Sequence, residues 1–365
     1  MTYNNECAHE YMTMTGPEVQ ELKTATKNVF TDAEITAVIK KYFPDENITE
    51  IIPLDGGTFN TLYRINGSGA LEDGVILKTG PCRDMELPGH EKEILRTEVY
   101  TYQILEGHKI PIPKLYGYDF SKSVLPCDYF IMERMHGKTW FEYWPIRDPG
   151  LMRALGKYTA RMHNVGMDWF GEISDDPAKR FATWGEAFTA MTDDALEEIR
   201  AQNLRIPFDE IRYAVASRRA MLDALQRPSL VNFDLWAGNI FVRKQEDGYF
   251  LTGMIDFERS FLGDPLASFS TALLLYDDVE KEEAFLEGYN KVSEKPLRIT
   301  DEDREKMLLY EMLMYLRSYV EASRYGFWFR SVQRVAIRDF VRSILSTLNR
   351  MEKTRVKNEI ISYTS

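Results

Sequence analysis

Residues 230–241 read LVNFDLWAGNIF, and residues 253–258 read GMIDFE. Asp234 and Asn239 lie at the two ends of a short loop, and Asp256 directly follows an apolar strand. The turn at Asp247-Gly248 between the two stretches is typical of a β-hairpin. Carboxylate and carboxamide oxygens at strand ends are donors that magnesium accepts, and bound phosphates can complete its coordination. Asp and Asn are also common turn residues, so this pattern alone leaves a plain hairpin open.

An upstream strand and helix carry one cation and one anion in apolar surroundings. Lys78 lies in the strand expected over 75–79, and Glu98 lies in the apolar stripe of a helix expected over about 89–106. A buried carboxylate without a partner costs several kcal/mol. We therefore predict that Glu98 pairs with Lys78; the alternative is a solvated lysine on an edge strand.

Hydrophobic patterning divides the chain into a β-rich part and a mainly helical part. Thr31 and Glu34 form a capping-box pattern that predicts the start of a helix over 30–43. Period-two patterns and turn residues predict strands over 48–54, 61–65, 75–79, 115–118 and 129–132, with a hairpin over 239–243 and 249–255. Apolar residues at three- and four-residue steps predict helices over 150–164, 180–201, 208–226, 265–276, 302–325 and 331–352.

Composition restricts the class of protein. The chain has 365 residues, 44% of them hydrophobic and 28% charged, which excludes collagen-like and wholly disordered proteins. The net charge of −12 disfavours nucleic acid and anionic membrane as partners. The same charge favours a cationic substrate, although an acidic balance also serves solubility alone.

Cysteine content and hydropathy bear on location. The three cysteines, Cys7, Cys82 and Cys127, are far apart and form no Cys-x-x-Cys pair, so neither a disulfide framework nor a zinc site is expected. The first residues show no basic stretch followed by an apolar one, and no apolar run approaches the roughly 20 residues of a spanning helix. We therefore expect a cytoplasmic location.

Together, these motifs resemble the aminoglycoside phosphotransferase and choline kinase families, which carry His-Gly-Asp, a loop to Asn, and then Ile-Asp-Phe or Ile-Asp-Trp followed by an acidic residue. The resemblance runs from about residue 30 to 290. It implies an α+β, protein-kinase-like fold of two lobes: a small antiparallel sheet with one key helix, and a larger, mainly helical lobe. We expect an N-terminal extension over 1–30, a nucleotide-binding N-lobe over 31–135, and a catalytic, substrate-binding C-lobe over 136–365.

The resemblance implies a role for each central residue. Asp234 would orient the acceptor hydroxyl and take its proton. Asn239 and Asp256 would hold Mg²⁺, and Lys78, fixed by Glu98, would position the α- and β-phosphates of ATP or GTP. The implied activity is transfer of the γ-phosphoryl group to a hydroxyl of a small molecule.

Two further stretches resemble the nucleotide-contacting parts of this family. Residues 54–63, LDGGTFNTLY, are similar to its nucleotide loop, although a Gly-Gly between strands is more often a plain hairpin turn. Residues 129–137, YFIMERMHG, are similar to its hinge, where backbone groups would read adenine. The candidate nucleotide-binding residues in these stretches are Gly56, Gly57, Thr58, Asn60, Met132, Glu133 and Met135.

Three positions depart from the family pattern. Asn232 stands in place of the usual histidine, Phe233 in place of glycine, and Ser268 where an acidic residue is common. Asparagine keeps a donor and an acceptor, so catalysis need not be lost. The departures leave open a catalytically impaired, nucleotide-binding pseudokinase that acts as a binding module, and a helical scaffold without a nucleotide site is a further alternative.

The acceptor is not identified by the sequence. Acidic residues among aromatic ones could form a wall for a cationic amine, but aromatic stripes at helical spacing are more often core and exposed glutamates more often solvate a helix. An aminoglycoside, a choline-like amine, an amino alcohol, a sugar and a nucleoside all remain open. Glu258 is expected either to assist the metal site or to pair with a nearby arginine. The candidate substrate residues are Asp277, Asp278, Glu311 and Tyr315.

Overall fold

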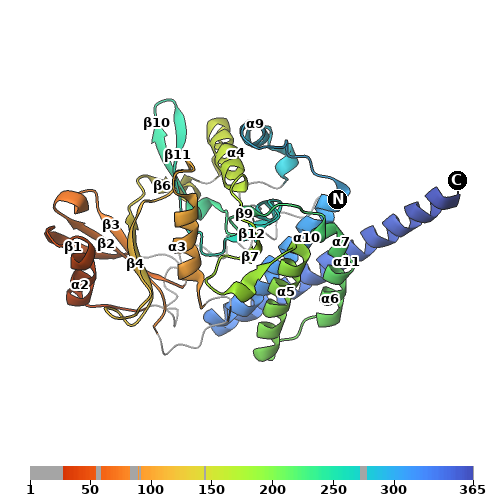
Figure 1. The fold of residues 1–365 in the computed structure, drawn as a ribbon, viewed down its shortest axis with the longest axis horizontal. Coiled ribbons are helices and arrows are strands. Elements are labelled where there is room, and N and C mark those ends of the chain that lie inside the picture. The colour runs from red at the N-terminus through yellow and green to blue at the C-terminus, as the bar shows by residue number, and fades with distance from the viewer. Residues whose placement is uncertain are drawn as a thin grey trace.

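The computed structural model of the protein describes residues 28–54, 59–82, 89, 92–143, 145–271 and 278–364. The chain forms two lobes, a small β-rich one and a larger, mainly helical one (Figure 1). The expected α+β architecture is confirmed. None of the helices in the described part of the chain combines the length and the apolar composition that a membrane crossing requires.

The small lobe is built on a five-stranded antiparallel sheet of order β1-β2-β3-β5-β4. Its strands are β1 (Ile48–Leu54), β2 (Thr61–Gly67), β3 (Val75–Thr79), β4 (Leu115–Asp119) and β5 (Tyr129–Glu133). Helix α2 (Asp32–Tyr42) begins at the predicted capping box of Thr31 and Glu34 and covers one face of the sheet. All five residues of the central strand β3 are buried.

Helix α3 (Ile94–Leu105) lies between the sheet and the large lobe (Figure 1). It begins five residues later than the sequence predicts, and residues 83–88, 90 and 91 lie outside the described part of the chain. Its buried face joins the core of the large lobe through Leu95, Val99 and Tyr102. Helix α3 therefore reaches the interface at which the two lobes meet.

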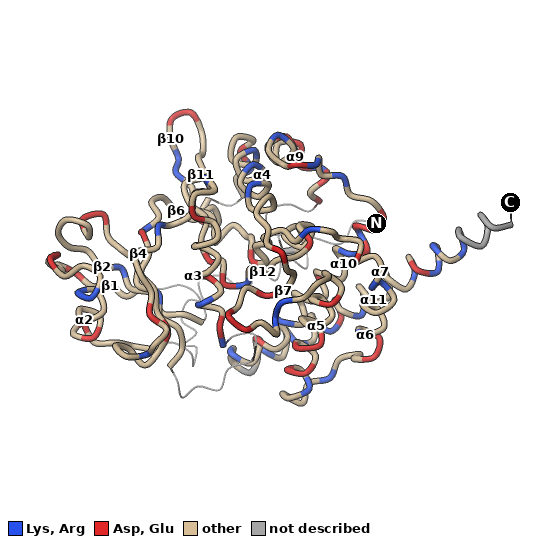
Figure 2. The backbone as a smooth tube through the Cα atoms, in the orientation of Figure 1, with Lys and Arg blue, Asp and Glu red and all other residues tan. Residues whose placement is uncertain are grey.

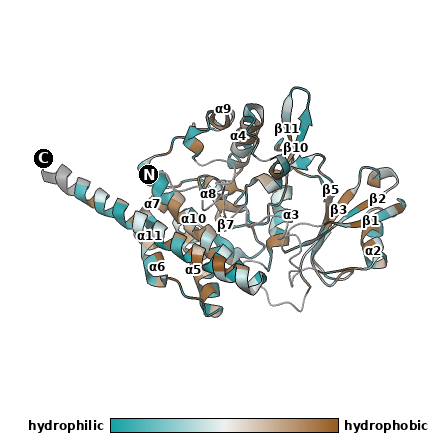
Figure 3. Ribbon diagram, turned by 180° about the vertical axis from the view of Figure 1, so that it is seen from behind, coloured by the Kyte–Doolittle hydropathy of each residue, from teal (hydrophilic) through white to brown (hydrophobic). Residues whose placement is uncertain are grey.

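The large lobe consists of helices around two small sheets. The helices are α4 (Pro149–His163), α5 (Trp184–Ala201), α6 (Phe208–Ala216), α7 (Arg219–Asp223), α8 (Ala267–Thr271), α9 (Glu283–Asn290), α10 (Asp301–Glu321) and α11 (Phe327–Thr364). Helices α4 and α9 approach closely at Gly156. A Cβ added to this glycine would lie 2.1 Å from the carbonyl oxygen of Phe285. Hydrophobic residues colour much of α5, whereas the end of α11 projects from the body and is largely hydrophilic (Figure 3).

The helix predictions for this lobe need five corrections. The helix expected over 331–352 is longer at both ends and runs over Phe327–Thr364. The helix expected over 208–226 is two helices, because the chain turns at Ser217 and Arg218 between α6 and α7. The helix expected over 180–201 begins only at Trp184, since residues 180–181 form strand β8 (Arg180–Phe181). Helix α10 ends at Glu321 instead of residue 325 and is followed by the 3₁₀ turn Ala322–Arg324. Helix α9 was not predicted.

Two small sheets position the loops of the large lobe. The predicted hairpin is confirmed as β10 (Ile240–Gln245) and β11 (Gly248–Met254), with β6 (Lys138–Thr139) as a third strand. The second sheet has the order β8-β7-β12-β9 and was not predicted; its further strands are β7 (Phe170–Glu172), β9 (Ser229–Val231) and β12 (Phe261–Gly263). Strand β9 leads into the 230–241 stretch, and β12 follows the 253–258 stretch, so one sheet and one hairpin fix both segments.

Candidate active site

The predicted ion pair between the strand lysine and the helix glutamate is present. The Nζ atom of Lys78 on β3 lies 2.6 Å from Oε2 of Glu98 on α3. Lys78 is 5% exposed and Glu98 is fully buried. The hydroxyl of Tyr102, one helical turn after Glu98, donates a hydrogen bond of 2.9 Å to Oε1. Both oxygens of the Glu98 carboxylate are therefore satisfied, which offsets part of the cost of burying its charge.

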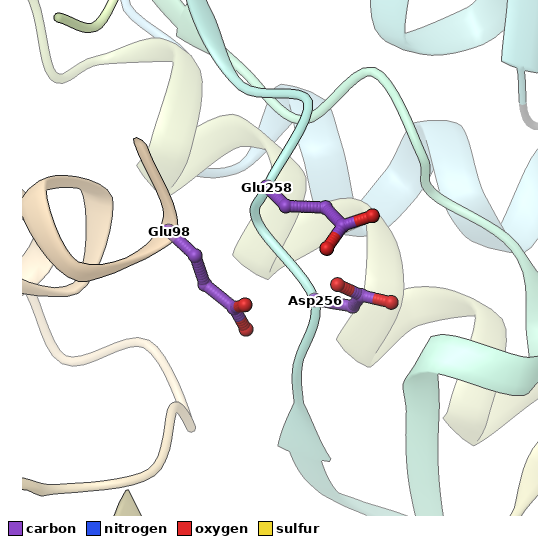
Figure 4. A group of neighbouring side chains, drawn as sticks. All are labelled: Glu98, Asp256 and Glu258. Atoms are coloured by element: carbon purple, nitrogen blue, oxygen red, sulfur yellow. The ribbon is translucent and has the colours of Figure 1, made fainter. Parts of the chain in front are cut away.

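Two more carboxylates from the large lobe reach the same ammonium group. The Lys78 Nζ atom lies 2.9 Å from Oδ1 of Asp256 and 3.5 Å from Oε2 of Glu258. Glu98 extends from α3 toward the loop that carries Asp256 and Glu258 (Figure 4). Each residue offers an oxygen that lies within 4.8 Å of those of the other two. We call Glu98, Asp256 and Glu258 the carboxylate cluster.

The backbone after β11 explains how Asp256 and Glu258, which are separated by one residue, both reach this cluster. Asp256 has a φ of +63°, in the left-handed region that an aspartate adopts more readily than most residues. The residue between the two acids, Phe257, is fully buried, and its ring centroid lies 5.5 Å from that of Tyr102. The turn thus directs both carboxylates to Lys78 while the intervening aromatic ring anchors the loop in the core.

The loop after β9 is held in one conformation by amide side chains. The Nδ2 atom of Asn239 donates to the carbonyl oxygen of Asp234 at 3.0 Å and to its Oδ2 at 3.1 Å. The Asn232 Oδ1 atom accepts a hydrogen bond of 2.9 Å from the backbone N–H of Asp234. The N–H of Ile255 donates to the carbonyl of Asn239 at 3.0 Å, which ties this loop to the segment carrying Asp256. Asn232, which replaces the usual histidine, therefore supports the loop.

Burial and charge perturb the titration of these groups. Burial raises the pKa of Asp234 to about 7, and the positive charge of Arg259 opposes the rise. Burial likewise raises the pKa of Glu98 to about 7 against the attraction of Lys78. The three carboxylates outweigh desolvation and raise the pKa of Lys78 well above its usual value. Asp234 therefore has a pKa close to neutrality, where a proton acceptor works best.

The candidate nucleotide-binding residues lie in different surroundings. Asn60 is buried and donates from Nδ2 to Oε2 of Glu258 at 2.8 Å, while its Oδ1 has no hydrogen-bond partner among the residues that the structure describes. Met132 is buried in β5, and the N–H of Glu133 donates to the carbonyl of Lys114 at 2.8 Å. This backbone donor of the expected hinge is therefore already engaged. Met135 packs against Gly253 of β11, and Gly56, Gly57 and Thr58 lie outside the described residues.

Three of the four candidate substrate residues lie in the described part of the chain. Asp278 caps the 3₁₀ turn Val279–Lys281 by accepting a hydrogen bond from the N–H of Glu280. Tyr315 on α10 stacks on Phe340 of α11 with centroids 5.0 Å apart, and Glu311 lies one turn before Tyr315. Asp277 lies outside the described residues.

The Ser268 departure has a structural counterpart. The Oγ atom of Ser268 lies 3.0 Å from Nε2 of His163, and the Tyr289 hydroxyl lies 2.8 Å from Nδ1. Burial lowers the pKa of His163 to about 3, so the imidazole is neutral. The serine hydroxyl takes the position of the usual acid beside a packing histidine.

Two residues near the site were not assigned a role from the sequence. Tyr102 supports Glu98, and its spacing of four residues from Glu98 on a helix was the available signal. Arg259 donates from Nη2 to Oε2 of Glu321 at 2.8 Å. Its only signal was its position directly after Glu258, which does not indicate where the guanidinium points.

Parts of two curated proteins are similar in sequence to this chain. The chain is 21% identical over 237 residues to mouse acyl-CoA dehydrogenase family member 10, covering 62% of this chain and 20% of that protein. It is 22% identical over 236 residues to the probable acyl-CoA dehydrogenase IBR3 of Arabidopsis thaliana, covering 60% and 27%. The chain thus spans about a quarter of the length of the curated relatives it matches.

Solved structures show the same fold at low sequence identity. The putative fructosamine-3-kinase of Thermobifida fusca superposes with a TM-score of 0.60 at 18% identity, covering 86% of this chain and 98% of that one. The aminoglycoside phosphotransferase APH(4)-Ia gives a TM-score of 0.58 at 13% identity, covering 88% and 99%. The model of the phosphotransferase enzyme family matches residues 50–309, more than two thirds of the chain. The chain belongs to the phosphotransferase enzyme family.

Proposed function

We propose that the protein transfers the γ-phosphoryl group of ATP or GTP to a hydroxyl group of a small molecule. The observation that carries the proposal is the position of Lys78, whose ammonium contacts carboxylates from both lobes near the Asp234–Asn239 loop. Two solved structures of APH(4)-Ia are ternary complexes of that enzyme with hygromycin B and either ADP or AMP-PNP. By analogy with these complexes, the nucleotide would bind in the cleft around Lys78.

The described residues suit a divalent cation held with a nucleotide. Three carboxylates surround a single ammonium, and the Oδ1 of buried Asn60 has no partner in the described part of the chain, so the cleft offers more oxygen ligands than its own cation uses. Asn239 and Asp256 would hold Mg²⁺, with Glu258 beside them. The metal would neutralise charge on the phosphates. The small lobe, 31–135, would bind the nucleotide and the large lobe, 136–365, the acceptor.

Within this proposal Asp234 is the proton acceptor. Its Oδ2 is oriented by Asn239, and its raised pKa matches the task of taking a hydroxyl proton near neutral pH. Lys78, held by Glu98, would contact the α- and β-phosphates. Asn232 keeps the hydrogen bond that the loop requires, which favours an active enzyme over the pseudokinase alternative.

The test compares nucleotide binding with turnover. We expect Asp234→Ala to lower kcat by about two to four powers of ten while Mg-ATP still raises the thermal midpoint. The matched control is Asp209→Ala, at an exposed position in the first turn of α6. Turnover of Asp234→Ala within a few-fold of wild type contradicts the assignment of the base. A thermal shift without turnover of any acceptor supports the binding module instead.

A further inference from the structure

A cavity of about 250 Å³ lies beside the carboxylate cluster. Its wall is formed by the start of α3, by β7 and β12, and by the end of α10, so both lobes contribute to it. Glu258 of the cluster is one of the lining residues. The cavity is lined by four cationic side chains of the large lobe, Lys179, Arg259, Arg317 and Arg324.

Two of these arginines are held in place by carboxylates. Arg317 donates from Nη2 to Oε1 of Glu172 at 2.7 Å, and Arg259 donates from Nη2 to Oε2 of Glu321 at 2.8 Å. A guanidinium has five N–H donors in a rigid plane, so one such bond fixes its orientation and leaves donors for a ligand. In Figure 2, acidic and basic residues lie close together around β7 and α5.

A buried hydroxyl adds an independent indication of a polar ligand. Ser260 lines the cavity and is 3% exposed, and its Oγ has no hydrogen-bond partner among the described residues. Buried polar atoms without a partner are rare in folded proteins, and each calls for an explanation. A ligand oxygen in the cavity would supply the missing partner for Ser260.

The cavity adjoins the carboxylate cluster through consecutive residues. Glu258, Arg259 and Ser260 all line it. Glu258 also lies 3.5 Å from the Lys78 Nζ atom, which is 2.9 Å from Asp256. A molecule bound by Arg259 would therefore lie beside the carboxylate cluster.

The available groups in this cavity favour an anion over a cation. Its carboxylates are already engaged: Glu172 by Arg317 and Lys179, Glu321 by Arg259, Glu258 by Lys78, Glu93 by the Ser174 hydroxyl, and Asp176 by the N–H of Ala178. The groups of the cavity that can donate to a ligand are guanidinium N–H groups, the ammonium of Lys92 and the Ser260 hydroxyl. The volume also lies below the range of about 300–1,000 Å³ that is typical of drug-sized ligands, which favours a compact molecule.

We propose that the acceptor is a compact hydroxylated anion whose carboxylate or phosphate group is bound by Arg259, Arg317 and Ser260. The inference rests on the proposed function. The acceptor oxygen forms a bond to the γ-phosphorus while the bond from that phosphorus to the β–γ bridging oxygen breaks. The hydroxyl proton goes to Asp234, and the products are a phosphate ester of the anion and the nucleoside diphosphate.

The experiment measures nucleotide consumption by the full chain with matched acceptors. The carboxylate arm contains glycolate, 3-hydroxypropionate and 4-hydroxybutyrate, each compared with its amide and with the amino alcohol of equal length. The phosphate arm contains glycerol 3-phosphate, compared with glycerol. We expect kcat/KM for at least one anion to exceed that of its neutral and cationic analogues by a factor of ten or more. The arm that responds identifies the anionic group.

Variants test whether the cavity is responsible. We expect Ser260→Ala and Arg317→Met to raise KM for the anion about tenfold or more, with the KM for ATP unchanged, and Arg317→Lys to restore part of the loss. Ser260→Ala removes no hydrogen bond within the protein, so it keeps the test valid if Arg317→Met fails to fold. The control Arg153→Met changes an exposed arginine of α4 and should leave both KM values unaltered.

The outcomes separate the two proposals. Turnover of amides, amino alcohols or sugars in preference to every anion overturns the inference and leaves the proposed function in place. A second outcome also overturns the inference. In this outcome no anion reacts with the wild type, and calorimetry detects no anion binding to Asp234→Asn in the presence of Mg-AMP-PNP. Absence of any thermal shift with Mg-ATP or Mg-GTP overturns the proposed function itself.

Discussion

The titration of Glu98 makes a quantitative prediction about stability. Its pKa is about 7 in the folded protein against an ordinary value of 4.5, because burial outweighs the attraction of Lys78. The folded state therefore binds more protons than the unfolded state between these two values. The contribution of Glu98 to stability is greatest below pH 4.5 and is lost as the pH rises through 7. Since one pKa unit corresponds to about 1.4 kcal/mol, the loss is roughly 3 kcal/mol.

Glu98→Gln isolates this effect, because glutamine keeps an acceptor for Tyr102 and is neutral at every pH. We expect the unfolding free energy of wild type, relative to the variant, to fall by roughly 3 kcal/mol between pH 4.5 and 8, as measured by urea denaturation. Glu106→Gln, at the exposed end of α3, is the control and should show no such trend. A constant difference between wild type and Glu98→Gln across this pH range would refute the reasoning, because it would mean that the pKa of Glu98 is the same in the folded and unfolded protein.

Three other substitutions test the packing around the site by urea denaturation. Tyr102→Phe leaves Oε1 of Glu98 without its donor, and we expect it to lower the unfolding free energy by about 1–3 kcal/mol. Gly156→Ala places a Cβ against backbone of α9 and should cost about 1–3 kcal/mol or more, whereas Gly326→Ala, with no atom within 4 Å, should change little; equal effects would contradict the close helix contact. The unfolding free energy of Asp256→Gly should exceed that of Asp256→Ala by about 1 kcal/mol. Both substitutions remove the charge, but only alanine is strained at the positive φ of this residue. The reverse order of stability would contradict the observed backbone conformation.

The Lys78–Glu98 pair could be predicted because the sequence places a carboxylate among apolar residues, where burial without a partner is costly. Glu98 interrupts an apolar helical stripe, and the cost of burying it alone required a cation nearby. The strand around Lys78 offered that cation in an equally apolar setting. The arrangement of Asp234, Asn239 and Asp256 was predictable for a different reason, since a hairpin turn brings its two flanking segments together.

The strands and residues that the sequence did not reveal depend on distant contacts. Strands β7, β9 and β12 have three residues each, too few for an alternating pattern to stand out. Glu321 pairs with Arg259, which is sixty-two residues away in sequence, and no local pattern indicates such a partner. Helical periodicity placed Glu311 and Tyr315 on a face of α10 without indicating that α11 covers it. Only tertiary packing decides which residues share such a face.

The contacts that assemble the site differ in kind between its two halves. Within the large lobe, hydrogen bonds from Asn239 to Asp234 and from Ile255 to Asn239 fix the Asp234–Asn239 loop against the hairpin. Between the lobes, Lys78 pairs with Asp256 at 2.9 Å and contacts Glu258 at 3.5 Å, and the Asp256 side chain is 30% exposed. Ligands and solvent can therefore compete for Asp256, whereas the hydrogen bonds from Asn239 to Asp234 lie wholly within the large lobe. Within the proposed function, phosphates that bind Lys78 would replace Asp256 as its partner, and these hydrogen bonds would keep Asp234 in position.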